Sequence, residues 1–530
     1  MINRLSEKIR SLLSNPNDLR KKATVFGGTV ILTSAVVVGA LVLVRQLGAI
    51  EGLELQAYDS LLRSRPDQGP DNRLVVVGIT EEDIKKLKEY PISDGTLVQT
   101  LKKIEEYQPL AIGIDILRDV PQGRGREALI EVMKQSDKMI AACKLSSANE
   151  PGNPAAPGVP QDRIGFADLP LDTDVSIRRN ILLSTPTPPK IAQEKPHFCN
   201  IADPENQVPS LSFLLSMLYL ETKGIKPEQT PDGDIKLGQT VFNRLGEKAG
   251  GYQKTGATDY QVLLNYRSPQ NPAKQVTITE LLEGKVDSTL IKDRIVLIGY
   301  TAQSTKDDFT TPYSAGLAES QKMPGVLIHA QSVSQILSAV LDNRPLMGYW
   351  PLWSEIFWIW GWSVVGGTLA WSIRRPWLFA LASGGAIAVL VGTSYGLLLV
   401  AVWVPLVPPI LAIVGTALGV VLVDRYSQVI YEGVKKGLLK LKIEIDSDKK
   451  QEEVDAITQS EYFQNLQEKA KERRNPKNNL NLDGESPSKD EVKEEKATEQ
   501  EAEPSSDADY FLRLQQKARK YRKKEDNSSE

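Results

Sequence analysis

The strongest constraint on this chain is an uncharged segment of 48 residues, 376–423. As a single helix it would be about 72 Å long at 1.5 Å per residue, more than twice the roughly 30 Å hydrocarbon core of a bilayer. We therefore predict two membrane-spanning helices, 376–396 and 402–423, joined by a turn between Gly396 and Pro405. The chain is expected to be a membrane protein although only 41% of its residues are hydrophobic.

Two further segments are long enough to cross a bilayer. Residues 23–44 form an uncharged run of 22 behind a leader, 1–22, and we interpret them as an uncleaved anchor rather than a cleaved signal peptide. Residues 349–373 contain one charge, Glu355, which we expect at the membrane interface; the alternative is a side chain that faces other helices. The sequence thus predicts one span before a large central segment and three spans after it.

Basic residues predict the orientation of these spans. The leader 1–22 holds six Lys or Arg against two acids, and both the Arg374-Arg375 pair and the residues that follow 423 are basic. Because basic loops stay in the cytoplasm, we expect a multi-pass protein with both termini inside the cell and residues 45–346 outside it.

The central segment alternates apolar strands with helices, which is typical of an α/β domain with a mainly parallel sheet. Residues 241–266 are instead expected to form antiparallel strands. The predicted strands are 74–80, 110–117, 139–145 and 295–300, and the predicted helices are 81–90, 96–107, 126–136 and 325–341.

Several motifs of this segment resemble, in order, those of the type 2 CHASE domain, the extracellular sensory module associated with cyclases and histidine kinases. The resemblance covers about residues 50–345 and extends to the three helices that usually follow. Thr80 and Glu81 stand where the family commonly has two Asp, and Val175 stands where it usually has Gly. The motifs are Tyr58–Pro66, Val75–Thr80, Tyr107–Leu117, Ile164–Arg179, Leu263–Tyr266, Arg294–Pro312 and Pro324–Ala330.

The resemblance implies a sensor of the bacterial inner (plasma) membrane that detects an extracytoplasmic stimulus, either a ligand or a protein. Relatives often carry a kinase or cyclase after the last span, and no such output domain is recognisable here. A structural membrane scaffold without signalling is an alternative hypothesis. The sequence is compatible with a homodimer.

Ligands of open α/β sheets bind beyond the carboxyl ends of the strands, and this rule selects the candidate ligand-binding residues. Asp115 is the best single candidate, since it could bind a ligand or hold the loop of Asp307 and Asp308 through a cation; the favoured alternative is that Asp115 caps the next turn. His329 is more simply explained as a packed core residue than as a sensor. The candidates are Thr80, Glu81, Asp115, Thr301, Asp307, Asp308 and His329.

Two other groups of residues have competing interpretations. Asp172, Asp174 and the Arg178-Arg179 pair fit a solvated turn with ion pairs as well as a ligand site. Cys143 and Cys199 both lie in the expected outer segment, where a disulfide can persist, but the apolar strand around Cys143 favours a buried free thiol.

Composition and motifs exclude several classes of function. The net charge of −3 argues against a strongly basic nucleic-acid binder, and two His and two Cys are too few for a four-ligand zinc site of His and Cys. The chain also lacks a phosphate-binding loop, the kinase motifs and a G-x-S-x-G elbow. We expect a protein without catalytic activity, metal or cofactor; an extracytoplasmic enzyme using Asp115 with Asp307 or Asp308 is the remaining alternative.

The C-terminal tail, 424–530, is highly charged, with 45 Lys, Arg, Asp or Glu among residues 426–530, so most of it is expected to be disordered. Two islands, 460–474 and 508–522, repeat the pattern Y-F-x-x-L-Q-x-K-A. As helices, each would present one apolar face to a cytoplasmic protein groove or an anionic lipid surface. The expected docking residues are Tyr462, Phe463, Leu466, Tyr510, Phe511 and Leu514.

Overall fold

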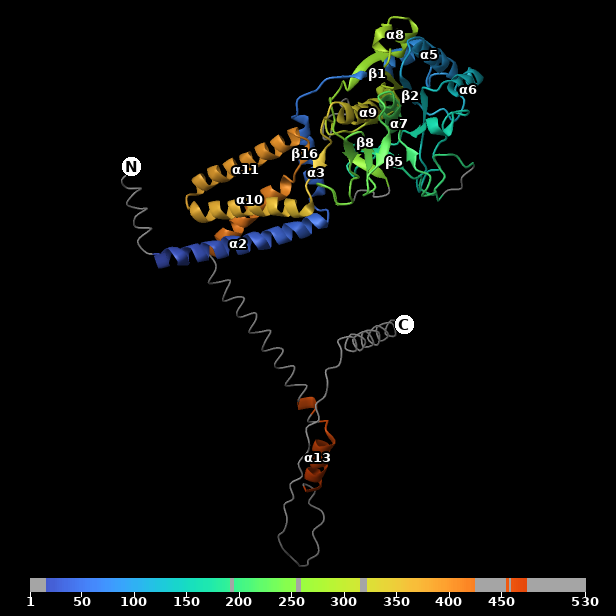
Figure 1. Ribbon diagram of the computed structural model, residues 1–530. Helices are drawn as coiled ribbons and strands as arrows, with labels where there is room; N and C mark the ends of the chain where they lie inside the picture. Colours follow the sequence, from blue (N-terminus) through green and yellow to red (C-terminus); the bar gives the residue numbers. More distant parts are fainter. Residues whose placement is uncertain are drawn as a thin grey trace, which may run out of the picture. The chain divides into compact units, whose positions relative to one another are not determined.

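The computed structural model describes residues 16–190, 195–253, 259–314, 322–424, 454–456 and 459–473. The described residues up to Asp424 belong to one compact unit, and the described part of the tail belongs to a second. Figure 1 shows the first unit as an α/β domain connected to a group of long helices.

A six-stranded sheet forms the centre of the α/β domain, and all of its neighbouring strands are parallel. Four of its six strands overlap the predicted ones, whereas the strands at 164–166 and 273–277 were not predicted. The prediction of a mainly parallel sheet is confirmed. In spatial order they are β11 (Ala273–Thr277), β1 (Asp71–Ile79), β12 (Ile295–Tyr300), β2 (Ala111–Asp115), β3 (Met139–Cys143) and β4 (Ile164–Phe166).

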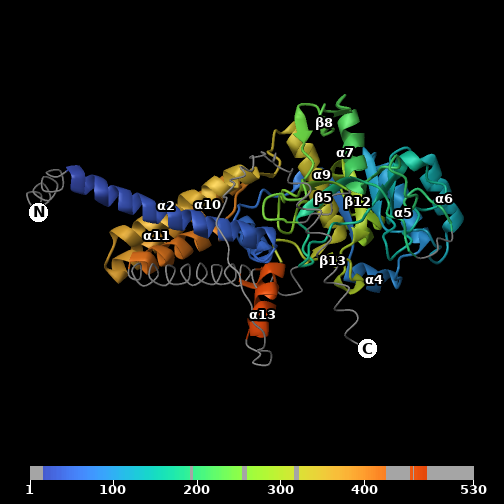
Figure 2. The ribbon, with the colours of Figure 1, turned by 90° about the horizontal axis from the view of Figure 1, so that it is seen from below.

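Helices cover both faces of this sheet because successive strand side chains point to opposite sides. Val76 and Leu297 pack on one side, while Val77 and Ile298 pack on the other. The first side is covered by α7 (Leu211–Glu221) and α9 (Gly325–Leu341). The second side is covered by α4 (Glu81–Leu87), α5 (Asp94–Glu106), α6 (Arg126–Gln135) and α8 (Ile278–Leu282), as Figure 2 also shows for α5 and α6.

Short antiparallel strands decorate this domain, in agreement with the prediction for 241–266. β10 (Tyr260–Leu263) pairs with β5 (Arg179–Ser184), and β9 (Thr240–Phe242) pairs with β8 (Ile235–Leu237). The other short elements are β6 (Val208–Pro209), β7 (Pro227–Gln229), β13 (Asp308–Phe309), β14 (Met323–Pro324), η1 (Gln161–Arg163), η2 (Ser288–Leu290) and η3 (Gln303–Thr305).

Among the described residues, three helical segments are long and apolar enough to cross a membrane: Gly27–Gln46, Pro376–Leu399 and Val407–Asp424. The first lies in α2 (Pro16–Gln46) and the second is α11. They correspond to three of the four predicted spans. The predicted turn after Gly396 is also present, since the chain leaves α11, forms β16 (Val402–Trp403) against β15 (Gly348–Tyr349), and enters the last helix.

The fourth predicted span corresponds to α10 (Leu352–Ser372), which is 21 residues long but is less apolar than the other three. In Figures 1 and 2, α10 runs alongside α2 and α11. Glu355 of α10 is only 2% exposed, and its carboxylate lies 2.6 Å from the guanidinium of Arg45 at the end of α2. The side chain therefore faces another helix, as the alternative describes, and its position at the membrane interface stays a prediction.

The second unit contains α13 (Glu461–Arg473), which matches the first predicted docking helix. Its apolar residues are accessible: Tyr462 is 77% exposed and Leu466 is 47% exposed, and Phe463 is exposed as well. The second repeat, with Tyr510, Phe511 and Leu514, lies outside the described residues, as do most of the tail and the first part of the leader.

The close approach of α7 to the sheet depends on glycine. A Cβ on Gly165 of β4 would lie 2.8 Å from the backbone nitrogen and Cα of Leu211, the first residue of α7. Because a helix backbone cannot yield as a side-chain tip can, any larger residue there must displace α7.

We predict that Gly165→Ala lowers the free energy of unfolding by about 1–3 kcal/mol, the usual cost of overpacking a core. The measurement is thermal unfolding of the full chain in detergent. The matched control is Gly52→Ala in α3 (Glu51–Arg63), where a Cβ meets nothing within 4 Å. If both variants melt together with the wild type, α7 does not pack on β4 in this way.

Candidate functional site

A pocket of about 590 Å³ opens beyond the carboxyl ends of β2, β3, β4 and β12. Parallel strands end at one edge of a sheet, and this edge is where ligands of α/β proteins bind. The volume lies within the range of small-molecule sites. Among its lining residues are Tyr90, Asp115, Asp168, Tyr300, Asp307 and Phe309.

Asp115 and Asp307 bring two carboxyl groups to this pocket. Asp115 ends β2, and its side chain is 10% exposed. Asp307 follows η3, and its backbone carbonyl accepts a hydrogen bond of 3.0 Å from the amide of Gly325 at the start of α9. Neither carboxyl group accepts a hydrogen bond from any residue that the structure describes. The predicted capping role of Asp115 is therefore wrong for the described residues, because no turn donates to it.

His329 on α9 is the third member of this cluster. Its Nε2 lies 3.8 Å from Oδ1 of Asp115, and its side chain is buried. Burial lowers the pKa of His329 to about 4, although the nearby Asp307 opposes that effect. At neutral pH the imidazole is therefore uncharged and does not compensate the carboxylates.

The pKa values of the two carboxyl groups are shifted in the opposite direction. Burial raises the pKa of Asp115 to about 7. The pKa of Asp307 also rises to about 7, first because of burial and then because of the neighbouring Asp115 carboxylate. Such shifts are typical of functional sites, where groups are held in an environment that does not suit their charge.

The other charged residues of the pocket are engaged elsewhere. Asp168 accepts a hydrogen bond of 2.8 Å from the amide of Leu145. The guanidinium of Arg118 donates to the carbonyl of Ile92 at 2.8 Å and lies 3.3 Å from the carboxylate of Asp94. Lys144 forms an ion pair with Glu150. Asp115 and Asp307 are therefore left without a cation beside them.

The structure separates the remaining predicted residues from this pocket. Thr80 is the N-cap of α4 in a capping box with Asp83, and Glu81 accepts a hydrogen bond of 2.8 Å from the amide of Ser304. Thr301 packs over Gly78. Asp308 pairs with Pro324 in the short β13–β14 ladder and does not line the pocket.

Asp168, Tyr90 and Tyr300 line the pocket but were not among the predicted site residues. Two of them carried a usable signal, since Tyr300 ends β12 and Asp168 follows β4 by two residues. The rule that selected Asp115 selects them too. Tyr90 follows a helix rather than a strand, so this rule could not have found it.

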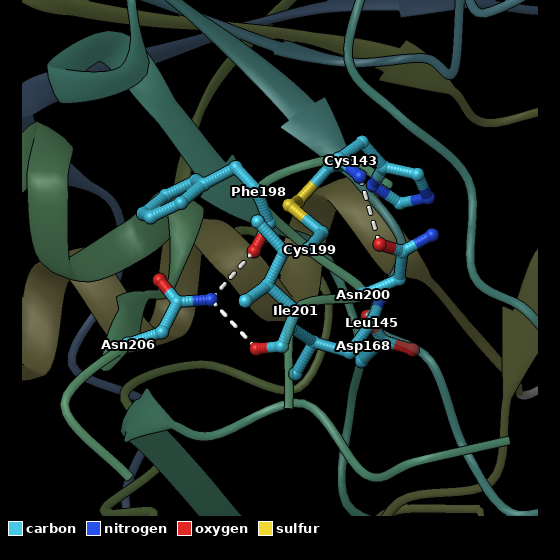
Figure 3. The surroundings of a disulfide bond; sticks show 9 residues. Cys143, Leu145, Asp168, Phe198, Cys199, Asn200, Ile201 and Asn206 are labelled. Carbon is cyan, nitrogen blue, oxygen red and sulfur yellow. Dashed lines mark hydrogen bonds between the residues drawn. A yellow bond between two sulfur atoms is a disulfide. The ribbon is translucent and has the colours of Figure 1, made fainter. Parts of the chain in front are cut away.

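A disulfide joins Cys143, at the end of β3, to Cys199, with 6.5 Å between the Cα atoms (Figure 3). The prediction of a buried free thiol is therefore wrong. The segment around Cys199 folds over the end of β3, where the amide of Ser146 donates to the carbonyl of Cys199 at 2.9 Å. Figure 3 also shows Asn206 donating to the carbonyls of Phe198 and Ile201, which holds this segment in place.

A second charged cluster connects the domain to α3, the helix that follows α2. Arg178 is completely buried, and its guanidinium donates to Asp59 of α3 at 2.7 and 2.6 Å. The same guanidinium reaches Asp172 at 2.8 Å and Asp174 at 2.6 Å. Arg179 and the hydroxyl of Tyr252 bind Asp172 as well. The ion pairs of one of the two interpretations are thus present, but Arg178, Arg179 and Asp172 are buried rather than solvated, and of these charged residues Asp174 alone keeps an exposed side chain, at 37%.

α3 also holds the turn between the last two apolar helices. The carboxylate of Glu54 accepts hydrogen bonds from the amides of Leu406 at 2.9 Å and Val407 at 2.8 Å. The rings of Tyr58 and Trp403 lie 4.6 Å apart. The same helix thus contacts the Arg178 cluster on one side and the turn of the apolar helices on the other.

Comparison with known families gives one match. A sequence model described as CHASE2 domain matches residues 35–368, more than half of the chain. No curated protein and no solved structure matches the chain.

Charge removal in the pocket should change how stability depends on pH. An ordinary Asp has a pKa near 3.8, whereas that of Asp115 is about 7, so the folded state holds the extra proton between these values and stability falls as pH rises through them. The wild type should therefore lose about 2–3 kcal/mol of unfolding free energy when the pH is raised from about 5 to about 8, and we predict that Asp115→Asn does not show this loss. Thermal unfolding at both pH values measures this, with exposed Asp162→Asn as control; an equal offset at both pH values would contradict it.

The disulfide closes a loop with a sequence separation of 56 residues. We predict that the double variant Cys143→Ser, Cys199→Ser lowers the free energy of unfolding by about 2–4 kcal/mol, because the unfolded chain regains the freedom of that loop. Unfolding is measured with and without reductant. Reductant should destabilise the wild type and leave the double variant unchanged; a wild type that does not respond to reductant would show that the bond does not form.

Proposed function

Because the chain belongs to the CHASE2 domain family, we propose that it is a non-enzymatic transmembrane sensor of the bacterial inner membrane. Its extracytoplasmic α/β domain receives a stimulus in the pocket of Asp115 and Asp307. The signal passes to the membrane helices and changes how the cytoplasmic tail is presented to a partner. The partner of the tail is a protein groove or an anionic lipid surface, which binds the apolar face of α13.

The observation that carries this proposal is a continuous connection from the pocket to the membrane helices. The loop that begins at Asp307 runs into Thr310, whose carbonyl accepts a hydrogen bond of 2.9 Å from the amide of Ile177. The next residue is Arg178, which binds Asp59 of α3. A ligand that moves the loop therefore acts on the helix that directly follows the first apolar span.

Such a connection transmits a signal only if the ligand binds two arrangements with different affinities. Moving the population from 1:99 to 99:1 takes a difference of about 5.5 kcal/mol between them. A buried pair of carboxyl groups can supply a large share of this difference in binding free energy. A ligand that compensates the charge of the pair binds only the arrangement in which both carboxyl groups face the pocket.

The positions of the helix ends support four spans. α10 begins near Arg45, at the domain end of α2, and Trp358 of α10 donates to the carbonyl of Pro405 in the turn beside the domain. Just after the other end of α10, Arg374 lies 3.6 Å from Asp424, the last described residue of the helix that begins at Val407. The two ends of α10 thus lie beside the ends of the neighbouring apolar helices, as expected of a helix that crosses the same membrane. With α10 as a fourth span, the tail would begin on the same side of the membrane as the leader.

We predict that cysteines placed on the two sides of the membrane are labelled differently. In spheroplasts, an impermeant maleimide should modify Asp162→Cys in the α/β domain and should reach Tyr462→Cys only after the cells are lysed. Both positions are exposed, so accessibility is matched. The labelled band is measured on a gel. Labelling of Tyr462→Cys in intact spheroplasts, with Asp162→Cys protected, would overturn the proposal.

A further inference from the structure

The pocket brings together two carboxyl groups that no described lysine or arginine pairs with. The Asp115 side chain is nine-tenths buried and, like that of Asp307, receives no hydrogen bond from a described residue. An isolated buried carboxylate is unfavourable unless it is paired. Two such groups lining one cavity are open to a positively charged donor that no described residue supplies.

The described charged groups around Asp115 and Asp307 do not supply a positive charge to this pair. Asp168 and Asp308 add negative charge, and Arg118 and Lys144 are engaged with Asp94 and Glu150. The charges that act on Asp307 are those of Asp115, His329 and Asp308, and none of them is a lysine or arginine. His329 is uncharged at neutral pH, because burial lowers its pKa to about 4.

The rest of the wall is aromatic. The rings of Tyr90 and Tyr300 meet edge to face with 6.0 Å between their centroids, and Phe309 also lines the pocket. Tyr300 is fixed because its hydroxyl accepts a hydrogen bond of 3.1 Å from the amide of Ile92. Aromatic faces attract cations, and they also provide apolar surface for an organic ligand.

A bare metal ion fits this wall poorly. Calcium takes six to eight oxygen ligands, and the described residues contain no group of three or more His, Cys, Asp or Glu that could hold a metal. A cavity of about 590 Å³ is also much larger than an ion needs. An organic cation provides both the charge and the bulk.

We propose that this pocket binds a small organic amine whose ammonium group lies against the carboxylates of Asp115 and Asp307 and whose carbon chain contacts Tyr90, Tyr300 and Phe309. This inference names the ligand class of the proposed sensor and rests on that function. The ammonium group donates the hydrogen bonds that the two carboxyl groups lack.

The test is calorimetric titration of the full chain in detergent with three probes: 1,4-diaminobutane, its neutral isostere 1,4-butanediol, and calcium chloride alone. The diamine should bind with a saturable isotherm, whereas the diol and calcium should not. Asp115→Asn and Asp307→Asn should each weaken diamine binding by at least about tenfold, because each removes a charged acceptor. The matched control is Asp162→Asn, an exposed position of the same domain that does not line the pocket, and it should bind as the wild type does.

Diamine affinity should also rise between about pH 6 and pH 8, since the carboxyl groups ionise over this range while an aliphatic amine remains protonated. The inference is overturned if the diol binds as well as the diamine, if calcium alone binds, if neither pocket variant weakens binding, or if no diamine binds. Each variant is first shown to unfold cooperatively, so that a loss of binding is not a loss of fold. The maleimide experiment does not involve the ligand. If the diamine fails to bind in the titration, the amine inference is wrong but the sensor proposal still stands.

Discussion

The buried guanidinium of Arg178 is the interaction on which this structure depends. It joins Asp59 of α3 to Asp172 and Asp174 of the domain, and its side chain is completely shielded from water. Removing one partner of a buried ion pair typically costs about 3–5 kcal/mol, because the other charge is left unpaired. Together with Leu55, Tyr58 and Leu62, which lie in the hydrophobic core of the domain, this group makes the helix that follows the first apolar span part of that core.

In the pocket, by contrast, two carboxyl groups lack a positively charged partner among the described residues. Where Arg178 is surrounded by carboxylates, Asp115 and Asp307 face each other's charge and a neutral His329, and their pKa values rise to about 7. A domain that needed only stability would gain from an apolar residue at either position. Raised pKa values of this kind at the carboxyl edge of a parallel sheet are typical of ligand sites, and they are the basis of the proposal made above.

Much of this arrangement was predictable from the sequence, and the limits have physical causes. Apolar strands and the spacing of helical residues gave four of the six strands and the helices α4, α5, α6 and α9, but not β4, β11, α7 or α8. The rule on strand ends brought Asp115 and Asp307 to one site. Burial of Arg178 was not predictable, since Asp59 lies 119 residues away. The disulfide was missed for the same reason: only the fold places Cys199 over the end of β3. Thr80 followed a strand as expected, but its hydroxyl serves the N-terminus of α4.

The central claim is that the Arg178 cluster holds α3 and, through α3, the turn between the apolar helices. Hydrogen exchange at the amides of Leu406 and Val407, which bind Glu54, tests it directly in the full chain in lipid nanodiscs. The account predicts that Asp59→Asn, which touches neither amide, accelerates their exchange, whereas Asp67→Asn on the exposed surface has no effect. Unchanged protection of both amides in Asp59→Asn would contradict the account, because the turn would then be held independently of the domain.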